Sequence, residues 1–334
     1  MARRSRRNAA RKRLNQNRHE GFLSEPSSRP SRLCYASFVI HLRNHRANLC
    51  VFAALGLFAA NAAAAPQPPS GQSPIQDPAE YKAYSDAVNT QDATARAEGL
   101  EGFVEQYPKS VVLTDALEQE MAAWQAAGDS KQVMKVAKRL LAADAGNIRA
   151  LGIVVALDRV NAATGDNAAL NEMCQDASGG MLAVPMWREP ANMAPADYVA
   201  LSKLLNDIFI GAEGYCAVQE KNYSQARDWL QRALKIDSTN VQDTYQLAVA
   251  DLESTPLLPE GFWYCARGIH MAESAAIPQD AGGMTAYCKA KYSNYHGTDD
   301  GWDALLTSVA DQDAPPPDFA AKFKPAPTAP APQK

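Results

Sequence analysis

The sequence predicts an all-α fold in which antiparallel helix hairpins stack as a solenoid. Apolar residues recur at helical spacing through the Ala-rich stretch 79–310, and strand patterns are nearly absent. Residues 114–147 and 207–240 form two 34-residue segments that align in register and end alike, in LLAADAGN and ALKIDSTN. A period of this size indicates a repeat protein, so we expect one repeat domain over 79–310 with degenerate copies.

The helices are expected in pairs, divided by turn sequences such as Gly128-Asp129 and Thr164-Gly165-Asp166. Pro195 suits the first turn of a longer helix. The glycine pairs Gly179-Gly180 and Gly282-Gly283 are interpreted as loop hinges. The expected helices are 79–89, 93–106, 114–127, 131–143, 148–162, 167–176, 195–220, 223–236, 241–253, 262–275, 284–292 and 301–309.

Proline marks both flanks of this domain. Residues 66–78 are rich in Pro, Gln, Ser and Gly and are interpreted as a linker. Residues 311–334 are rich in Pro and Ala, and proline donates no backbone hydrogen bond, so this tail is expected to be disordered, without helix or sheet.

The N-terminal region has the layout of a secretory leader. A basic flank precedes a short apolar run over 49–60, and small residues follow it, with Ala62 and Ala64 in an A-x-A frame. The run is too short to span a bilayer. We therefore expect 39–65 to be a signal peptide and the protein to be periplasmic or secreted; an uncleaved anchor is the alternative. The basic extension 1–38 is explained by translation that starts at Val39, or else by a nucleic-acid-binding arm.

Charge is divided unevenly along the chain. Residues 1–46 hold 12 of the 33 Lys and Arg but two of the 37 Asp and Glu, so this part is formally +10 and the rest is −14. An acidic body repels phosphate backbones, so no nucleic-acid partner is expected for the mature chain.

The second segment resembles the tetratricopeptide repeat family. Gly214 stands at the small position of the first helix, Tyr223 and Ala226 open the second helix, and Ala233 and Asp237 occupy its later small position and its end. The first segment supplies Trp124, Gly128 and Asp129 at the aromatic and turn positions. Four positions depart from the family pattern: Glu120, Ala145, Glu213 and Ser238. Residues 261–269 and 291–302 loosely resemble secreted acidobacterial repeat proteins of unassigned role.

The resemblance implies a non-enzymatic scaffold that binds a protein or peptide in a concave groove. Carrying the groove positions of the family onto this sequence gives Glu118, Gln125, Arg149, Arg159, Tyr215, Gln219 and Tyr245. The set is mixed in charge and lacks the Lys/Asn pattern with which chaperone-binding relatives hold a terminal carboxylate, so that type of ligand is not assumed. A structural or assembly role in the cell envelope is the alternative function. The resemblance also places Gly214 and Ala226 where the two helices of one repeat touch.

The connection 178–195 is unusually long, and it carries Met186 and Trp187. Long connections are often functional, so this segment is a candidate binding loop; the alternative is that Trp187 fills the core below it.

Four cysteines follow the leader: Cys174, Cys216, Cys265 and Cys288. Export favours disulfides, and Cys265 could meet Cys288 if their two segments form a hairpin. Buried free thiols remain the alternative, because both residues have apolar or aromatic neighbours.

Motifs that carry chemistry are few. The sequence has no G-x-S-x-G, P-loop or G-x-G-x-x-G, and His270 with Glu273 is too small a set to hold a metal ion. His296, followed by Asp299 and Asp300, is the one candidate for an unfamiliar catalytic site, and a simple turn is the preferred interpretation. No catalytic residue, metal or cofactor is therefore expected.

Overall fold

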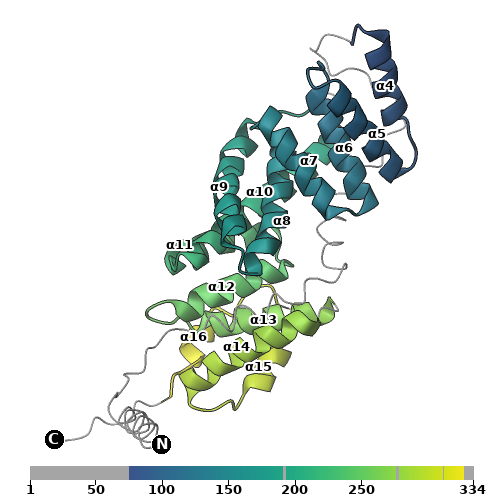
Figure 1. Ribbon diagram of the computed structural model, residues 1–334. Coiled ribbons are helices and arrows are strands. Elements are labelled where there is room, and N and C mark those ends of the chain that lie inside the picture. The colour runs from purple at the N-terminus through teal and green to yellow at the C-terminus, as the bar shows by residue number, and fades with distance from the viewer. Residues whose placement is uncertain (1–74, 191–192, 276–277, 311, 327–334) are drawn as a thin grey trace, which may run out of the picture. The chain divides into compact units, whose positions relative to one another are not determined.

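The computed structural model describes residues 75–190, 193–275, 278–310 and 312–326, except the side chains of 278–280, and all of them belong to one unit of the chain. The expectations for the extension 1–38, the leader 39–65 and most of the linker concern residues outside these ranges. Within the described residues the fold is all-helical, with no strand (Figure 1). The helices are α4 Pro78–Val88, α5 Ala93–Gln106, α6 Leu113–Ala127, α7 Ser130–Ala143, α8 Ile148–Ala163, α9 Asn167–Ala183, α10 Pro195–Gln219, α11 Tyr223–Ile236, α12 Val241–Glu253, α13 Glu260–Ser274, α14 Pro278–His296, α15 Trp302–Ser308 and α16 Phe319–Lys322, with a 3-10 turn η2 at Val184–Met186.

The helices pack in sequence, each against its neighbours along the chain, which is the arrangement of an α-helical solenoid. Three apolar cores follow one another. The first joins α4 to α8, the second joins α8, α9 and α10, and the third runs from the end of α10 to α16. Because α8 and α10 each contribute to two cores, packing continues through the described part of the chain.

Polar caps set many of the helix starts. An Asp or Asn side chain accepts a hydrogen bond from a backbone N–H of the first turn, which satisfies a donor that has no partner within the helix. These capping residues are Asp77, Asp92, Asp129, Asn147, Asp166, Asn222 and Asn240.

The two 34-residue segments share their turn geometry. Gly128 ends α6 in the left-handed conformation with φ 77°, and Lys221 stands at the corresponding place after α10 with φ 62°. The residues that follow them, Asp129 and Asn222, both cap the next helix. Each segment also ends at a capping asparagine, so the register of the sequence alignment agrees with the local structure.

In each 34-residue segment a large residue of one helix packs on a small residue of the other. The helix that carries the large residue differs between the two segments. A Cβ added to Gly214 of α10 would lie 2.5 Å from Cγ of Leu230 in α11, so this glycine allows the two helices to approach closely. The corresponding positions of the first segment hold Met121 in α6 and Ala137 in α7, both fully buried. The total side-chain volume is therefore similar although each position changes, as close packing requires. Ala226 is fully buried in α11, on which Gly214 packs.

Two disulfides join helices of this unit. Cys174 of α9 is bonded to Cys216 of α10, and Cys265 of α13 is bonded to Cys288 of α14, with Cα atoms 5.9 Å apart in both pairs. The segments of Cys265 and Cys288 form the hairpin that the pairing requires. The alternative of buried free thiols is not the arrangement in the structure.

The expected loop hinges are wrong. Gly179 and Gly180 lie inside α9, which continues to Ala183, and Gly282-Gly283 lies inside α14. Gly180 is needed for packing, because a Cβ there would meet three ring atoms of Phe209 at less than 3.0 Å. A Cβ on Gly179 meets nothing within 4 Å.

These adjacent glycines give a matched pair of substitutions. Gly180→Ala is expected to lower the free energy of unfolding by about 1–3 kcal/mol, because the new methyl group overpacks the core against Phe209. Gly179→Ala is expected to raise it by about 0.5–1 kcal/mol, since alanine is the better helix former and the site is open. Urea unfolding of both variants measures the difference, and equal midpoints would contradict this packing of α9 on α10.

The expectation of a tail without helix is also wrong for part of 311–334. Phe319–Lys322 forms α16, and Phe319 and Phe323 pack against the third core. The backbone N–H of Ala326 donates to the carbonyl of Tyr295 at 2.7 Å, and Arg267 pairs with Asp313 at 3.0 Å. Aromatic burial thus holds a short helical turn between proline-rich sequences.

Candidate functional site

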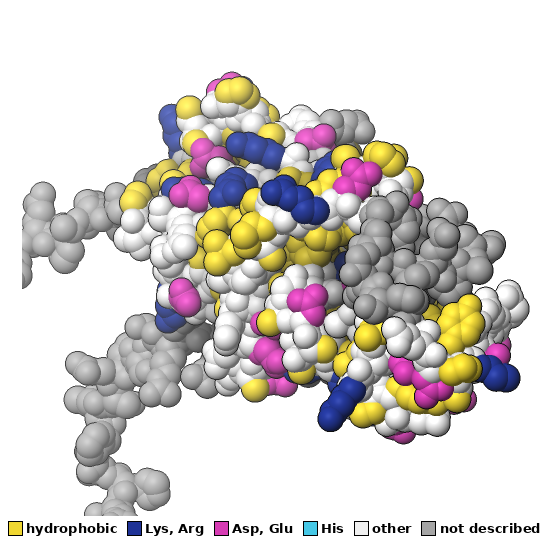
Figure 2. Space-filling model, turned by 90° about the horizontal axis from the view of Figure 1, so that it is seen from above, with side chains coloured by type: hydrophobic (Ala, Val, Ile, Leu, Met, Phe, Trp, Pro, Cys, Tyr) yellow, Lys and Arg dark blue, Asp and Glu magenta, His cyan; other side chains and the backbone are white. Residues whose placement is uncertain are grey.

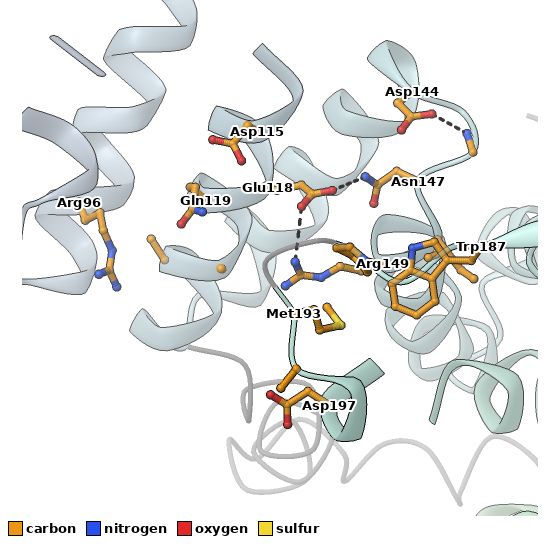
Figure 3. A pocket seen from close by; sticks show the side chains of 16 residues that line it. Arg96, Asp115, Glu118, Gln119, Asp144, Asn147, Arg149, Trp187, Met193 and Asp197 are labelled. Atoms are coloured by element: carbon orange, nitrogen blue, oxygen red, sulfur yellow. Dashed lines mark hydrogen bonds and ion pairs between the residues drawn. The ribbon is translucent and has the colours of Figure 1, made fainter. Parts of the chain in front are cut away.

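A cavity of about 460 Å³ lies between the first helices of the unit and the long connection before α10 (Figure 3). Its walls come from α5, α6, the turn between α7 and α8, the connection, and the start of α10. The lining residues are Arg96, Asp115, Glu118, Gln119, Ala122, Ala123, Asp144, Gly146, Asn147, Ile148, Arg149, Trp187, Pro190, Met193, Ala194 and Asp197.

One wall is a fixed polar network around Glu118 of α6. The side-chain amide of Asn147 donates to Oε1 of Glu118 at 2.5 Å, and Nη1 of Arg149 donates to Oε2 at 3.4 Å. Oδ1 of Asn147 also accepts the backbone N–H of Ala150 at 3.0 Å, as the cap of α8. The same asparagine therefore starts α8 and orients a carboxylate toward the cavity.

Another part of the lining is apolar and aromatic. The ring of Trp187 lies 4.8 Å from the ring of Tyr198, centroid to centroid, and the Tyr198 hydroxyl donates to the Trp187 carbonyl at 2.9 Å. These two contacts hold the connection against α10. Pro190 and Met193 also line the cavity and add to its apolar surface.

Two charged groups of the cavity lack a partner among the described residues. Arg96 of α5 and Asp197, in the first turn of α10, make no hydrogen bond or ion pair through their side chains there. Asp115 accepts a hydrogen bond from the hydroxyl of Tyr84. Hydrogen bonds therefore hold Glu118 in place, whereas the side chains of Arg96 and Asp197 have no partner among the described residues.

The structure brings together Glu118 and Arg149 from the expected groove and Trp187 from the expected binding loop. Met186 does not line the cavity; it is 68% exposed, as are the neighbouring apolar residues Leu182 (72%) and Val199 (63%). Figure 2 shows apolar side chains gathered beside Lys and Arg side chains on one face of the molecule.

The remaining groove positions do not form a surface. Arg159, Tyr215 and Tyr245 are buried, and the expectation that they line an open groove is corrected here. The reason is that α10 packs against both α8 and α12, where Arg159 and Tyr215 lie, and that Tyr245 faces Gly268 of α13 and the ring of Tyr287 in α14. Gln125 and Gln219 are half-buried, and Nε2 of each is buried without a hydrogen-bond partner among the described residues.

Arg159 instead belongs to a buried ionic cluster. Its Nη2 lies 2.5 Å from Oδ1 of Asp243, which joins α8 to α12 across 84 positions of sequence, and its guanidinium lies 5.7 Å from the centroid of the Tyr215 ring. Gly211 makes room for this pair, because a Cβ there would lie 2.6 Å from Oδ2 of Asp243. Burial, and then the charges of Asp243 and Asp237, raise the pKa of the nearby Asp207 to about 7.

This pKa predicts that the protein is more stable at pH 5 than at pH 8. An unfolded aspartate has a pKa of about 3.9, so between about pH 4 and pH 7 the folded state binds more protons than the unfolded state. The free energy of unfolding therefore falls as pH rises through this window. Asp251 and Glu120, whose pKa values burial also raises to about 7, act in the same direction.

Asp207→Asn is expected to flatten this pH profile and to raise stability at pH 8, because the variant removes a buried charge that titrates. Urea midpoints measured from pH 5 to pH 8 provide the test, with the exposed Asp228→Asn as the control. A wild-type midpoint that rises with pH over this range would contradict the assignment.

The candidate catalytic residues are engaged in other contacts. His296 ends α14 in an aromatic cluster, 4.3 Å from the ring of Phe323 and 4.5 Å from that of Tyr292, and burial lowers its pKa. Asp299 pairs with Lys289 at 3.0 Å, and the carbonyl of Asp300 accepts the hydroxyl of Tyr292 at 2.8 Å. No hydrogen bond joins His296 to either aspartate in the described part of the chain.

Sequence reasoning missed Arg96, Asn147 and Asp197 as site residues. A capping signal was visible at Asn147, which stands before an apolar helix, but its second bond to Glu118 joins positions 29 apart. Over the described ranges, no group of three or more His, Cys, Asp or Glu is placed to hold a metal ion, and no helix is long and apolar enough to cross a membrane.

No protein-family model, curated protein or solved structure matches this chain. The fold and the cavity define the class of the protein. It is an all-helical protein whose helices pack in sequence and leave a polar and aromatic cavity between them.

Proposed function

We propose that this chain is an exported, non-enzymatic scaffold of the tetratricopeptide type, which binds an extended peptide segment of a protein partner in the cavity at Glu118, Arg149 and Trp187. One observation carries the proposal. Two groove positions implied by the family resemblance and the aromatic residue of the long connection, which are far apart in sequence, line the same cavity. A hollow lined by a polar network and by an aromatic side chain suits a peptide backbone with one inserted side chain.

The tetratricopeptide type is supported by the paired hairpins 114–147 and 207–240. They share a left-handed turn residue, a capping residue after it and a terminal capping asparagine, and they exchange large and small residues at the helix contact. Such regularity is expected of copies of one unit that stack through neighbouring interfaces.

The proposal that the protein is exported is supported by its disulfide bonds. Both cysteine pairs of the described residues are oxidised, and disulfides persist mainly in oxidising compartments such as the periplasm or the extracellular space. The proposed leader at 39–65 would deliver the chain there.

Blocking the cavity tests peptide binding. Ala122→Trp places an indole on the α6 wall at a half-buried position, and we expect it to reduce binding of a displayed random dodecapeptide library to the full-length chain at least about tenfold, since one side chain then occupies the space of the ligand. Ala142→Trp, at an exposed position of α7, is the matched control and should bind as wild type does. Equal binding by both folded variants, or no binding by the wild type, would sink the proposal.

A further inference from the structure

The charges that line the cavity are unbalanced. Four carboxylates face two guanidinium groups there: Asp115, Glu118, Asp144 and Asp197 against Arg96 and Arg149. Arg149 is engaged with Glu118 at 3.4 Å. The remaining three carboxylates are opposed by Arg96 alone, so an approaching ligand meets a net negative cavity.

Asp197 is the carboxylate best placed for a ligand. It is half-buried in the first turn of α10, and its side chain has no hydrogen-bond or ion-pair partner in the described ranges. A carboxylate with vacant acceptor positions beside an apolar wall is stabilised by a charged donor more than one in open water, because the surroundings screen the interaction less.

Trp187 lines the same cavity as Asp197 and offers the surface that a cation prefers. Its ring is fixed through Tyr198, and Pro190 and Met193 extend the wall beside it. Tryptophan is the most favourable aromatic partner of an ammonium or guanidinium group, and the methylene stem of such a side chain covers apolar surface while its head stays polar.

We infer that the cavity selects a basic side chain of the bound segment, a lysine or arginine, with its head between Trp187 and Asp197 and its stem against Met193. This inference rests on the proposed peptide binding and names the chemistry of the ligand. The carboxylates that have no ion-pair partner repel acidic side chains, and this repulsion excludes acidic segments from the cavity.

Three fluorescein-labelled dodecapeptide mixtures test it. All share random small and aromatic residues and differ only at position six, which is Arg, Gln or Glu. By anisotropy with the full-length chain, the Arg mixture is expected to bind about fivefold more tightly than the Gln mixture, as a cation–π contact with a partly desolvated ion pair predicts, and the Glu mixture most weakly.

Asp197→Asn should bring the Arg and Gln mixtures within about twofold of each other without unfolding the protein. Asp303→Asn is the matched control, because Asp303 also lies in the first turn of a helix, α15, and does not line the cavity. Equal binding of all three mixtures by wild type, or tighter binding of the Glu mixture, overturns the inference while peptide binding stands. Failure of every mixture to bind the folded chain overturns both.

Discussion

Replacing Arg159 by methionine is expected to lower the free energy of unfolding by about 3–5 kcal/mol, because it leaves a buried carboxylate without its counter-charge. The side chain of Asp243 is fully buried, and Oδ2 already lacks a hydrogen-bond partner among the described residues. Asp207 adds a second acidic group to the same cluster. Urea unfolding at pH 8 gives the measurement.

Two further variants separate the charge effect from the loss of side-chain packing. Arg232→Met removes an exposed arginine that lies 4.4 Å from the Trp229 ring, and it is expected to cost no more than about 1 kcal/mol. Adding Asp243→Leu to Arg159→Met is expected to restore a large part of the lost stability, since the buried carboxylate of Asp243 is then removed together with its counter-charge. A loss that is equal for Arg159 and Arg232 would show that the buried pair contributes nothing.

Removing the disulfides is expected to produce losses that follow the length of the closed loop. The sequence separation is 42 for Cys174–Cys216 and 23 for Cys265–Cys288. By the loop-entropy argument, cross-linking contributes roughly 4 kcal/mol for the first pair and roughly 3 kcal/mol for the second. The double variants Cys174→Ala/Cys216→Ala and Cys265→Ala/Cys288→Ala should unfold at correspondingly lower urea concentrations.

Mass spectrometry of unreduced peptides decides the pairing itself. Linked peptides are expected for both pairs, and reduction of the wild type should reproduce the combined loss of the two double variants. Alkylated free cysteines at all four positions, or a linked peptide that joins Cys216 to Cys265, would contradict the arrangement.

The sequence was sufficient for the helices because their signals are local. Apolar spacing, the capping Asp129 and the first-turn Pro195 all act within one helix, and the structure places α7 and α10 within one residue of the expected bounds. The repeat register was also readable, since the segments 114–147 and 207–240 hold corresponding residues at corresponding turns.

The glycine pairs and the proline-rich tail led to wrong predictions of where helices end. The structural effect of glycine and proline depends on the tertiary neighbours of the segment that contains them. From the sequence, Gly180 is interpreted as a hinge. In the structure it is a helical residue that has to lack a Cβ, because the ring of Phe209 occupies that space. The tail is predicted to be disordered from its composition, but Phe319 and Phe323 pack on the third core and order part of it. Neither partner is near in sequence, and so no local pattern identifies it.

The candidate site also has a part that could be predicted from the sequence and a part that could not. By itself the sequence determined the all-helical class, the hairpin period and the candidates Glu118, Arg149 and Trp187. Only the tertiary structure decided that these three line one cavity with Arg96 and Asp197. It also decided that Arg159, Tyr215 and Tyr245 are buried. The physical reason is that a helical pattern shows which face of a helix is apolar, whereas the contacts of a polar side chain depend on which neighbouring helix covers it.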